Sequence, residues 1–199
     1  MEGEILVTPG ELARYVEVLR RGGVVACATE TLVGLLADAL DHDAVERVAR
    51  IKGRPEESPI AVLIPAFESA ATVASSFPDQ AQCLALRHWP GPLTLILPAR
   101  PGVPSPLTRD GTIGVRVPGP SPALDLCRAF GGPLTATSAN RTGEPPARTA
   151  AEVEAALGSE LDAIVPADAP GGLPSTVVDA TVSPPRVVRA GAITRITED

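Results

Sequence analysis

The apolar residues of the chain follow two different spacings, and the first marks a helix. Leucine and valine recur every three to four residues between positions 12 and 19, as on one face of a helix. Thr8 and Glu11 have the spacing of a capping box just before this segment, and Gly22-Gly23 follows it as a stop signal. We therefore predict a first helix between these two signals.

The same signals predict four more helices further along the chain. Asp43 is the expected cap of the second, which should end at Lys52-Gly53 because Pro55 disfavours helical dihedrals at the residue before it. The other three are expected from Pro78-Asp79 to about Trp89, from Pro122 to Phe130, and from a capping box at Thr149 and Glu152 to Gly158.

The second spacing consists of short apolar runs bounded by glycine, proline or polar residues, which predict buried strands. These runs are residues 24–28, 60–64, 93–97, 112–117, 134–137, 163–165, 176–178 and 187–188. Residues 29–35 and 141–148 are expected to be loops. Because helices and strands alternate throughout, we predict an α/β fold with a mixed sheet, forming a single domain over residues 5–196.

Composition and charge indicate which kinds of ligand the chain could bind and where in the cell we expect it. The 199 residues carry a formal net charge of −7, which disfavours a broad nucleic-acid-binding surface and favours a small anionic ligand in a local basic pocket. No apolar run reaches membrane-spanning length, and the acidic start Met1-Glu2-Gly3-Glu4 lacks a signal-peptide pattern. We therefore expect a cytoplasmic protein with no membrane partner.

Three cysteines and two histidines give little support for a disulfide framework or a zinc site. Cys27, Cys83 and Cys127 are widely spaced and form no C-x-x-C pair, and His42 and His88 stand apart. We expect all three cysteines to be small buried hydrophobic residues.

Two residue types are nearly absent from the chain. Among 17 basic residues only Lys52 is a lysine, and Asn140 is the only asparagine. We interpret the one lysine and the one asparagine as residues that the chemistry of the protein requires. The alternative is that both persist at the surface by chance.

Four short segments could carry that chemistry. Lys52 and Arg54 place two cations at a helix exit, which suits phosphate but also suits the helix dipole. Ser138 and Asn140 end a strand and offer a hydroxyl and an amide, or form an ordinary turn. Glu30, directly after Thr29, could be a base, a metal ligand or the partner of an arginine.

Arg116 is an arginine between two valines of a predicted strand. If it is buried, it needs an anionic partner, such as a ligand carboxylate or phosphate. Alternatively, the strand alternates and Arg116 lies on its solvent-exposed face. The chain contains no P-loop, no dinucleotide-binding glycine motif and no G-x-S-x-G elbow. No covalent nucleophile is therefore predicted, and electrostatic catalysis on phosphates is favoured.

Taken together, the segments resemble the YrdC family over nearly the whole chain. The matching segments are GGVVACATETLVGL (22–35), IKGRPEESPIAVLI (51–64), WPGPLTLIL (89–97), TIGVRVP (112–118), PLTATSAN (133–140), STVVD (175–179) and VVRAGAI (187–193). The family's K-x-R and S-x-N signature falls on Lys52/Arg54 and Ser138/Asn140, which include the sole lysine and the sole asparagine.

The resemblance implies a twisted α/β sheet around a deep electropositive cavity, and synthesis of threonylcarbamoyl-AMP and pyrophosphate from L-threonine, bicarbonate and ATP. It implies Mg²⁺ accompanying ATP, with metal ligands left unspecified, and a separate transferase complex that modifies tRNA; weak direct tRNA binding is left open. It assigns nine residues: for ATP Lys52, Arg54, Thr112, Ser138, Asn140 and Arg189, and for threonine Thr29, Arg116 and Ser175.

Three positions depart from the family pattern. Val33 stands where the family often has tyrosine, and Ala28 and Ala190 stand where it often has proline. Val33 removes an aromatic ring near the expected substrate, which leaves threonine affinity or substrate identity open. The alternatives are a non-catalytic RNA-binding or ribosome-assembly module, and a related enzyme that forms a different carbamoyl-adenylate.

Overall fold

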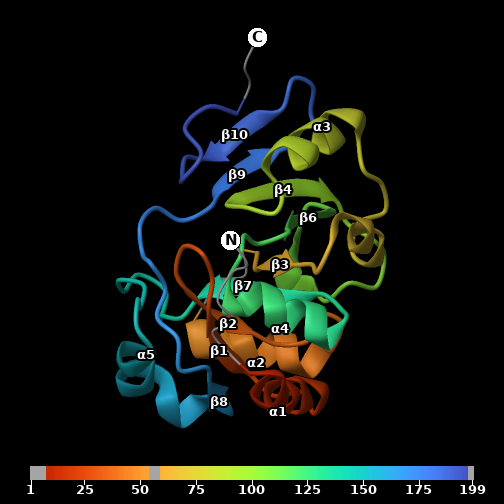
Figure 1. Ribbon diagram of the computed structural model, residues 1–199. Helices are drawn as coiled ribbons and strands as arrows, with labels where there is room; N and C mark the ends of the chain where they lie inside the picture. The colour runs from red at the N-terminus through yellow and green to blue at the C-terminus, as the bar shows by residue number, and fades with distance from the viewer. Residues whose placement is uncertain (1–7, 54–58, 197–199) are drawn as a thin grey trace.

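The structure is a computed structural model that describes residues 8–53 and 59–196. Ten strands in this part of the chain form one mixed sheet, in the order β10-β9-β4-β6-β3-β7-β2-β1-β8, with β5 paired to β6. Figure 1 shows the strands stacked from β10 at the top to β8 at the bottom, with α3 beside the upper strands and α1, α2 and α4 beside the lower ones. The expected α/β fold with a mixed sheet is confirmed.

The elements of the described residues have the following bounds. The helices are α1 Pro9–Arg20, α2 His42–Lys52, α3 Asp79–His88, α4 Pro122–Phe130 and α5 Ala150–Leu157, with short 3-10 helices η1 Phe67–Thr72, η2 Ser105–Leu107 and η3 Gly158–Glu160. The strands are β1 Val25–Ala28, β2 Val33–Leu36, β3 Ala61–Leu63, β4 Leu93–Pro98, β5 Thr108–Arg109, β6 Thr112–Arg116, β7 Leu134–Ser138, β8 Ala163–Ile164, β9 Thr176–Asp179 and β10 Arg186–Arg189.

The sheet is mixed because parallel and antiparallel pairs alternate around its centre. Strand β3 pairs in parallel with β6, in the register Val62↔Val115, and antiparallel with β7, in the register Val62↔Thr135. Strand β4 pairs antiparallel with β6 and in parallel with β9. Segments far apart in the sequence thus lie side by side, and this brings the predicted site residues together.

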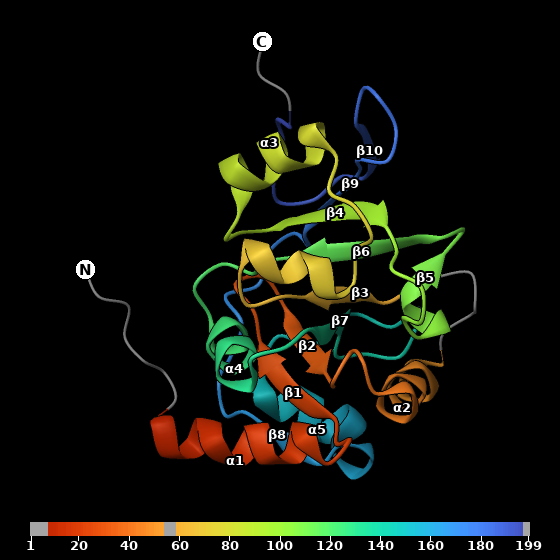
Figure 2. The ribbon, with the colours of Figure 1, turned by 90° about the vertical axis from the view of Figure 1, so that its right-hand side faces the viewer.

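Both faces of the lower sheet are buried, and β1 shows why its sequence is continuously apolar. Val24 and Ala26 belong to an apolar cluster with residues of α2, while Val25 and Cys27 belong to a second cluster with residues of α1 and α4. Figure 2 shows α2 and α4 on opposite sides of this part of the sheet. A strand buried on both faces reads as an apolar run without alternation. Truncating a fully buried side chain such as Leu19, on α1, to alanine would cost about 2–5 kcal/mol.

The ends of the first two helices follow from their capping residues. The predicted capping box of Thr8 and Glu11 is present at α1. At α2 the predicted cap, Asp43, is wrong: the Asp41 side chain accepts from the backbone amides of residues 43 and 44, and Asp43 lies in the first turn. The predicted end is confirmed, because Gly53 follows Lys52 with φ 56°, in the left-handed region that glycine tolerates.

Two other predictions are corrected by the structure. Residues 29–35 are not all loop: Val33–Leu36 is β2, which pairs with both β1 and β7 and leaves only a short turn after β1. Cys83 is exposed, although Cys27 and Cys127 are buried as expected, and all three are free thiols. The exposure follows from its place on the outer side of α3, whose buried residues are Ala81, Leu84 and Ala85.

The search for membrane-spanning helices covered the same described residues. Within them, none of the helices has the length and apolar character that crossing a membrane requires.

Candidate active site

A cavity of about 560 Å³ lies on one face of the sheet and collects the predicted site residues. Alternate residues of β3, β4 and β6 form part of its wall, among them Ala61, Thr94 and Gly114. Of the nine predicted residues, Arg54 lies outside the described residues, and the other eight all line this cavity: Thr29, Lys52, Thr112, Arg116, Ser138, Asn140, Ser175 and Arg189.

The cavity lies directly beside the apolar core and shares residues with it. Leu36 and Leu63 line the cavity and also belong to the apolar cluster that packs under α1 and α4. The two helices thus cover the sheet over β1 and its neighbours, and the same face is open further up, towards β4 and β6. Rigid strands therefore carry most of the polar groups of the cavity, which fixes their positions.

At one end of the cavity the sole lysine contacts the sole asparagine. Lys52, at the last residue of α2, is 3% exposed, and its Nζ donates to the carbonyl oxygens of Ser138 (2.7 Å) and Asn140 (2.5 Å) and to Asn140 Oδ1 (2.9 Å). Asn140 Nδ2 donates in turn to the carbonyls of Arg141 (2.9 Å) and Glu144 (2.6 Å). Lys52 therefore forms one hydrogen-bonded unit with Ser138 and Asn140 of the predicted signature.

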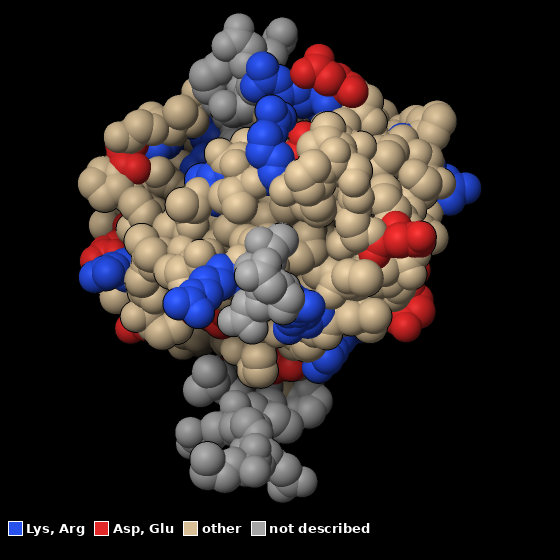
Figure 3. Space-filling view, turned by 90° about the horizontal axis from the view of Figure 1, so that it is seen from above, with Lys and Arg blue, Asp and Glu red and all other residues tan. Residues whose placement is uncertain are grey.

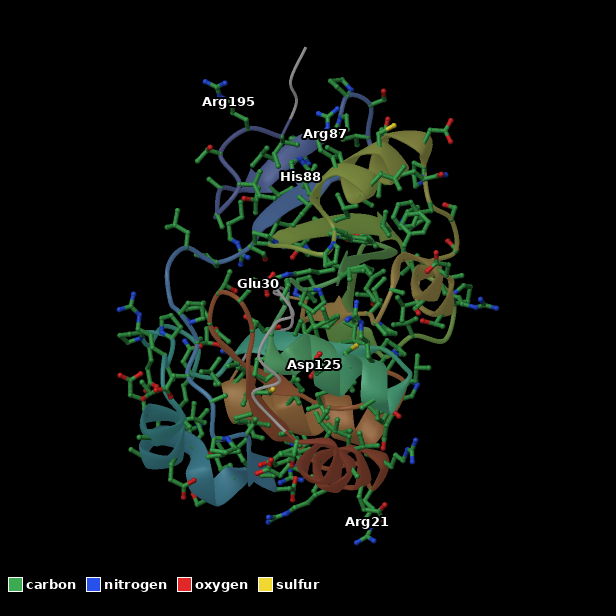
Figure 4. The ribbon with its side chains drawn as sticks, viewed as in Figure 1. Arg21, Glu30, Arg87, His88, Asp125 and Arg195 are labelled. Carbon is green, nitrogen blue, oxygen red and sulfur yellow. The ribbon has the colours of Figure 1, made fainter. Side chains whose placement is uncertain are left out.

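At the other end, Arg116 is 6% exposed and is held by two groups, Gly91 and Glu30. Its Nε donates to the carbonyl oxygen of Gly91 (3.0 Å), and its Nη2 forms an ion pair with Glu30 Oε1, which also accepts from the backbone amide of Gly119 (2.6 Å). Of the possible roles for Glu30, the structure shows the arginine partner. Figure 4 shows Glu30 near the middle of the molecule.

The Arg116–Glu30 pair is not fully hydrogen-bonded. Among the described residues, Glu30 Oε2 and Arg116 Nη2 are buried atoms without a hydrogen-bond partner, although Nη2 takes part in the ion pair. Buried polar atoms are normally paired, and exceptions gather at functional sites.

A hydroxyl pair lies near Arg116. Arg189 Nη2 donates to the carbonyl oxygen (2.8 Å) and the Oγ (3.1 Å) of Ser175, whose Oγ lies 2.8 Å from Thr94 Oγ1. Desolvation lowers the pKa of Arg189, and the nearby charge of Arg116 lowers it further. Two guanidinium groups whose charges interact favour an anion between or beside them.

Thr29 uses its hydroxyl within its own turn. Its Oγ1 donates to the carbonyl oxygen of Leu32 (2.7 Å) and accepts from the amides of Thr31 (3.2 Å) and Leu32 (3.1 Å). One hydrogen and two lone pairs are thereby used. Thr31, which is 7% exposed and lines the cavity, has its own Oγ1 at 3.0 Å from Thr29 Oγ1.

The charge of the cavity is opposite in sign to that of the whole chain. Its described lining contains Lys52, Arg109, Arg116 and Arg189 and no aspartate or glutamate, whereas the chain carries −7. Such a pocket concentrates anions. Figure 3 shows acidic side chains lying among the basic ones on the upper face, so this face offers no broad basic surface.

No metal site is evident in the part of the chain that the structure describes. Within residues 8–53 and 59–196, no group of three or more His, Cys, Asp or Glu side chains could hold a metal ion. Burial disfavours the thiolate form of both buried cysteines: it raises the pKa of the Cys27 thiol, and it raises the pKa of Cys127 to about 12.

Five polar residues of the cavity were not among the predicted site residues: Thr31, Thr94, Arg109, Thr137 and Thr142. Thr94 had a usable signal, because it is the polar member of the alternating strand Leu93–Leu97, whose leucines face the core. Arg109 and Thr142 had none, since an arginine or threonine beside a turn is ordinary.

Comparison with known proteins gives the family. The profile of the Sua5/YciO/YrdC family, described as "Telomere recombination", matches residues 17–191. The chain is 39% identical over 177 residues to a threonylcarbamoyl-AMP synthase of Pyrococcus abyssi, covering 88% of this chain and 52% of that protein. It is 37% identical to one of Klebsiella pneumoniae, covering 85% of this chain and 90% of that protein.

A solved structure agrees with the sequence relatives. The P. abyssi Sua5 structure complexed with L-threonine superposes with a TM-score of 0.87 at 37% identity, covering 92% of this chain and 54% of that one. The chain spans about half the length of the P. abyssi protein. With the profile matching most of its residues, the chain belongs to the Sua5/YciO/YrdC family.

Proposed function

We propose that the chain is a threonylcarbamoyl-AMP synthase, which forms threonylcarbamoyl-AMP and pyrophosphate from L-threonine, bicarbonate and ATP. The observation that carries this proposal is the cavity: eight residues predicted from separate segments line it, with four cations and no carboxylate among its described lining residues. Relatives that bear the name threonylcarbamoyl-AMP synthase support the choice of reaction.

The reaction balances without an enzyme nucleophile. The threonine amine attacks carbon dioxide and loses a proton, or attacks bicarbonate with loss of a water molecule, and in either case becomes a carbamate. A carbamate oxygen then attacks the α-phosphorus of ATP, a new O–P bond forms, and the bond to the β-phosphate oxygen breaks to release pyrophosphate. The protein supplies orientation and neutralises the charge of the phosphates, which together provide most of the rate.

The roles of the residues follow from where they lie in the cavity. Arg116 is proposed to bind the threonine carboxylate, because its guanidinium lines the cavity and is held in place by Glu30 and Gly91. Ser175 and Thr29 complete the threonine site, Thr29 by shaping the turn. ATP is proposed to contact these residues: Arg54, Thr112, Ser138, Asn140 and Arg189.

Mg²⁺ does not fit a site made by the described residues of the cavity. Mg²⁺ prefers carboxylate and phosphate oxygens, and the described lining supplies hydroxyls, an amide and four cations but no carboxylate. We propose that the ion arrives already bound to the triphosphate, where it neutralises phosphate charge, and that these residues do not hold it.

The product is an unstable mixed anhydride, so a second enzyme must consume it. We propose a separate threonylcarbamoyl transferase complex as that partner and tRNA as its acceptor, with direct binding of tRNA to this chain weak at most. A cytoplasmic location and a single domain over residues 5–196 remain predictions.

Pyrophosphate release tests the proposal. Purified protein should release pyrophosphate only when L-threonine, bicarbonate and Mg-ATP are all present, and omission of any one should abolish release. Absence of release with the complete mixture would contradict the proposal. Salt-sensitive tRNA binding without turnover would instead favour a non-catalytic RNA-binding module.

A further inference from the structure

We propose that Lys52 is a positioning residue: its ammonium group holds the Ser138–Asn140 turn in the shape that the nucleotide site needs, and it does not itself bind a phosphate. The consequence for ATP rests on the proposed function. The structural part of the inference can be tested on the protein without any substrate.

The first argument is the count of hydrogens on the ammonium group. It has three, and three oxygens lie within 2.9 Å of Nζ: the carbonyl oxygens of Ser138 and Asn140, and Asn140 Oδ1. The Ser138 hydroxyl lies further away, at 3.4 Å. These oxygens use all three hydrogens, so none is left to donate to a phosphate.

The second argument is that the main chain joins the same two segments. The carbonyl oxygen of Lys52 accepts from the amide of Thr142 (2.8 Å), and Arg141 Nη1 donates to the carbonyl oxygen of Ile51 (3.3 Å). The last carbonyls of a helix have no partner within the helix. Here the segment after Asn140 supplies donors to them, so the end of α2 and the turn form one unit.

The third argument is the cost of moving the lysine. At 3% exposure, Lys52 would have to leave three acceptors, two of them backbone carbonyls, without their donor in order to reach a ligand. The cavity also offers a more accessible cation, since the Arg109 side chain is 59% exposed and its ion pair is with the exposed Asp110. A phosphate would therefore be bound by the arginines, and Lys52 keeps Ser138 Oγ and the Asn140 amide where they are.

The sole lysine allows a direct measurement. An amine-acylating reagent can modify only one side chain of this protein, Lys52, and mass spectrometry of the digested chain gives its rate of modification. We expect Lys52 to react at least about 20-fold more slowly in the folded protein than in denaturant, with no further slowing by ATP. Rapid labelling of the free protein that ATP suppresses would overturn the proposal.

Stability without ligand provides the second test. Lys52→Met should lower the unfolding temperature of the substrate-free protein by about 5 °C or more, because buried acceptors lose their donor. The control Arg109→Met removes an exposed cavity cation and should change that temperature by less than about 2 °C. An unchanged unfolding temperature for Lys52→Met would contradict the positioning role. If that variant does not fold, the labelling rates of the unaltered protein decide.

A double-mutant comparison separates positioning from a general loss of structure. If Lys52 acts through the turn, Lys52→Met and Asn140→Ala remove the same thing, and the double variant should bind ATP within about threefold of the weaker single variant. If the two single losses of ATP affinity multiply in the double variant, Lys52 contacts the nucleotide independently. Complete absence of ATP binding by the unaltered protein would contradict the proposed function, while the labelling and stability results would still decide the role of the lysine.

Discussion

The two ends of the cavity differ in how completely their polar groups are paired. At the Lys52 end, the ammonium group of Lys52 and both the oxygen and the nitrogen of the Asn140 amide are hydrogen-bonded within the protein. Around Arg116 and Glu30, the buried Glu30 Oε2 lacks a hydrogen bond among the described residues, and Arg116 Nη2 has only its ion pair with Glu30. At the Lys52 end the polar groups have their partners before any ligand binds. At the Arg116 end a ligand can supply a partner that the protein does not.

The difference indicates a division of labour. A saturated network fixes geometry, and removing one member leaves several groups unpaired. An unsatisfied buried group costs about 1–3 kcal/mol until a partner arrives, and a ligand that supplies the partner recovers that cost on binding. We therefore expect changes at the Lys52 end to affect stability first, and changes at the Arg116 end to affect threonine binding first.

The largest expected effect comes from removing the cation of the incomplete end. Arg116→Met should reduce kcat/KM for threonine by about 1000-fold, because the carboxylate loses its charged partner and the half-buried Glu30 is left without its own. Steady-state kinetics with varied threonine would measure this. The control Arg21→Met, whose side chain is 76% exposed, should stay within twofold of the unaltered protein. A loss of less than tenfold for Arg116→Met would contradict the assignment.

At the complete end, Asn140→Asp keeps the shape of the side chain and removes its two donors. The carboxylate would face the carbonyl oxygens of Arg141 and Glu144, to which Asn140 Nδ2 now donates, so the 141–148 loop should loosen. We expect ATP affinity to fall by about 30-fold and hydrogen exchange in the loop to accelerate. Unchanged exchange in this loop would show that the amide does not hold it.

A smaller effect is expected from the group that holds Arg116. Glu30→Gln keeps an acceptor for the amide of Gly119 but loses the charge that orients the guanidinium, so the KM for threonine should rise about tenfold. Binding of threoninol, which lacks the carboxylate, should change by less than twofold in calorimetry. Equal weakening of both ligands would mean that Glu30 supports the fold and not Arg116.

The hydroxyl pair should contribute less than either charged group. The Thr94 and Ser175 hydroxyls have two hydrogens and use one between them, so one remains for a ligand. Thr94→Val should therefore reduce kcat/KM by about five- to tenfold, and Thr94→Ser should restore most of it. If the serine variant is as impaired as the valine variant, packing and not the hydroxyl matters here.

The smallest effect concerns a group outside both ends. Cys83 is the exposed thiol, while Cys27 and Cys127 are buried with raised thiol pKa values. Iodoacetamide at pH 8 should modify Cys83 alone and leave activity unchanged. Inactivation that follows modification of Cys27 or Cys127 would contradict the absence of a thiol role.

The sequence was sufficient for most of the fold because its signals are local. The capping box at Thr8 and Glu11 and the glycine after Lys52 each specify a helix end through a few neighbouring residues. Strand β2 was missed because its four residues follow a tight turn, and their pairing with β1 and β7 depends on residues elsewhere in the chain. Asp41 and Asp43 are equally good caps by residue type, and only the position of the chain decides between them.

The site was predictable as a set of residues but not as a network. The rarity of lysine and asparagine pointed to Lys52 and Asn140, yet their contact joins positions 88 residues apart and cannot be read from spacing. The partner of Arg116 was open for the same reason, since Glu30 and Gly91 come from other segments. Which hydrogens remain for a ligand depends on this network, and so the role of each residue does too.

The measurement closest to the central claim follows the carbon of bicarbonate into the product. Protein incubated with ¹³C-bicarbonate, L-threonine and Mg-ATP should yield a species whose mass equals AMP joined to a threonine carbamate, one unit heavier than with unlabelled bicarbonate. The unaltered protein should form it and Arg116→Met should not. ATP consumption without this product would show that the cavity serves a different acceptor, and would contradict the account.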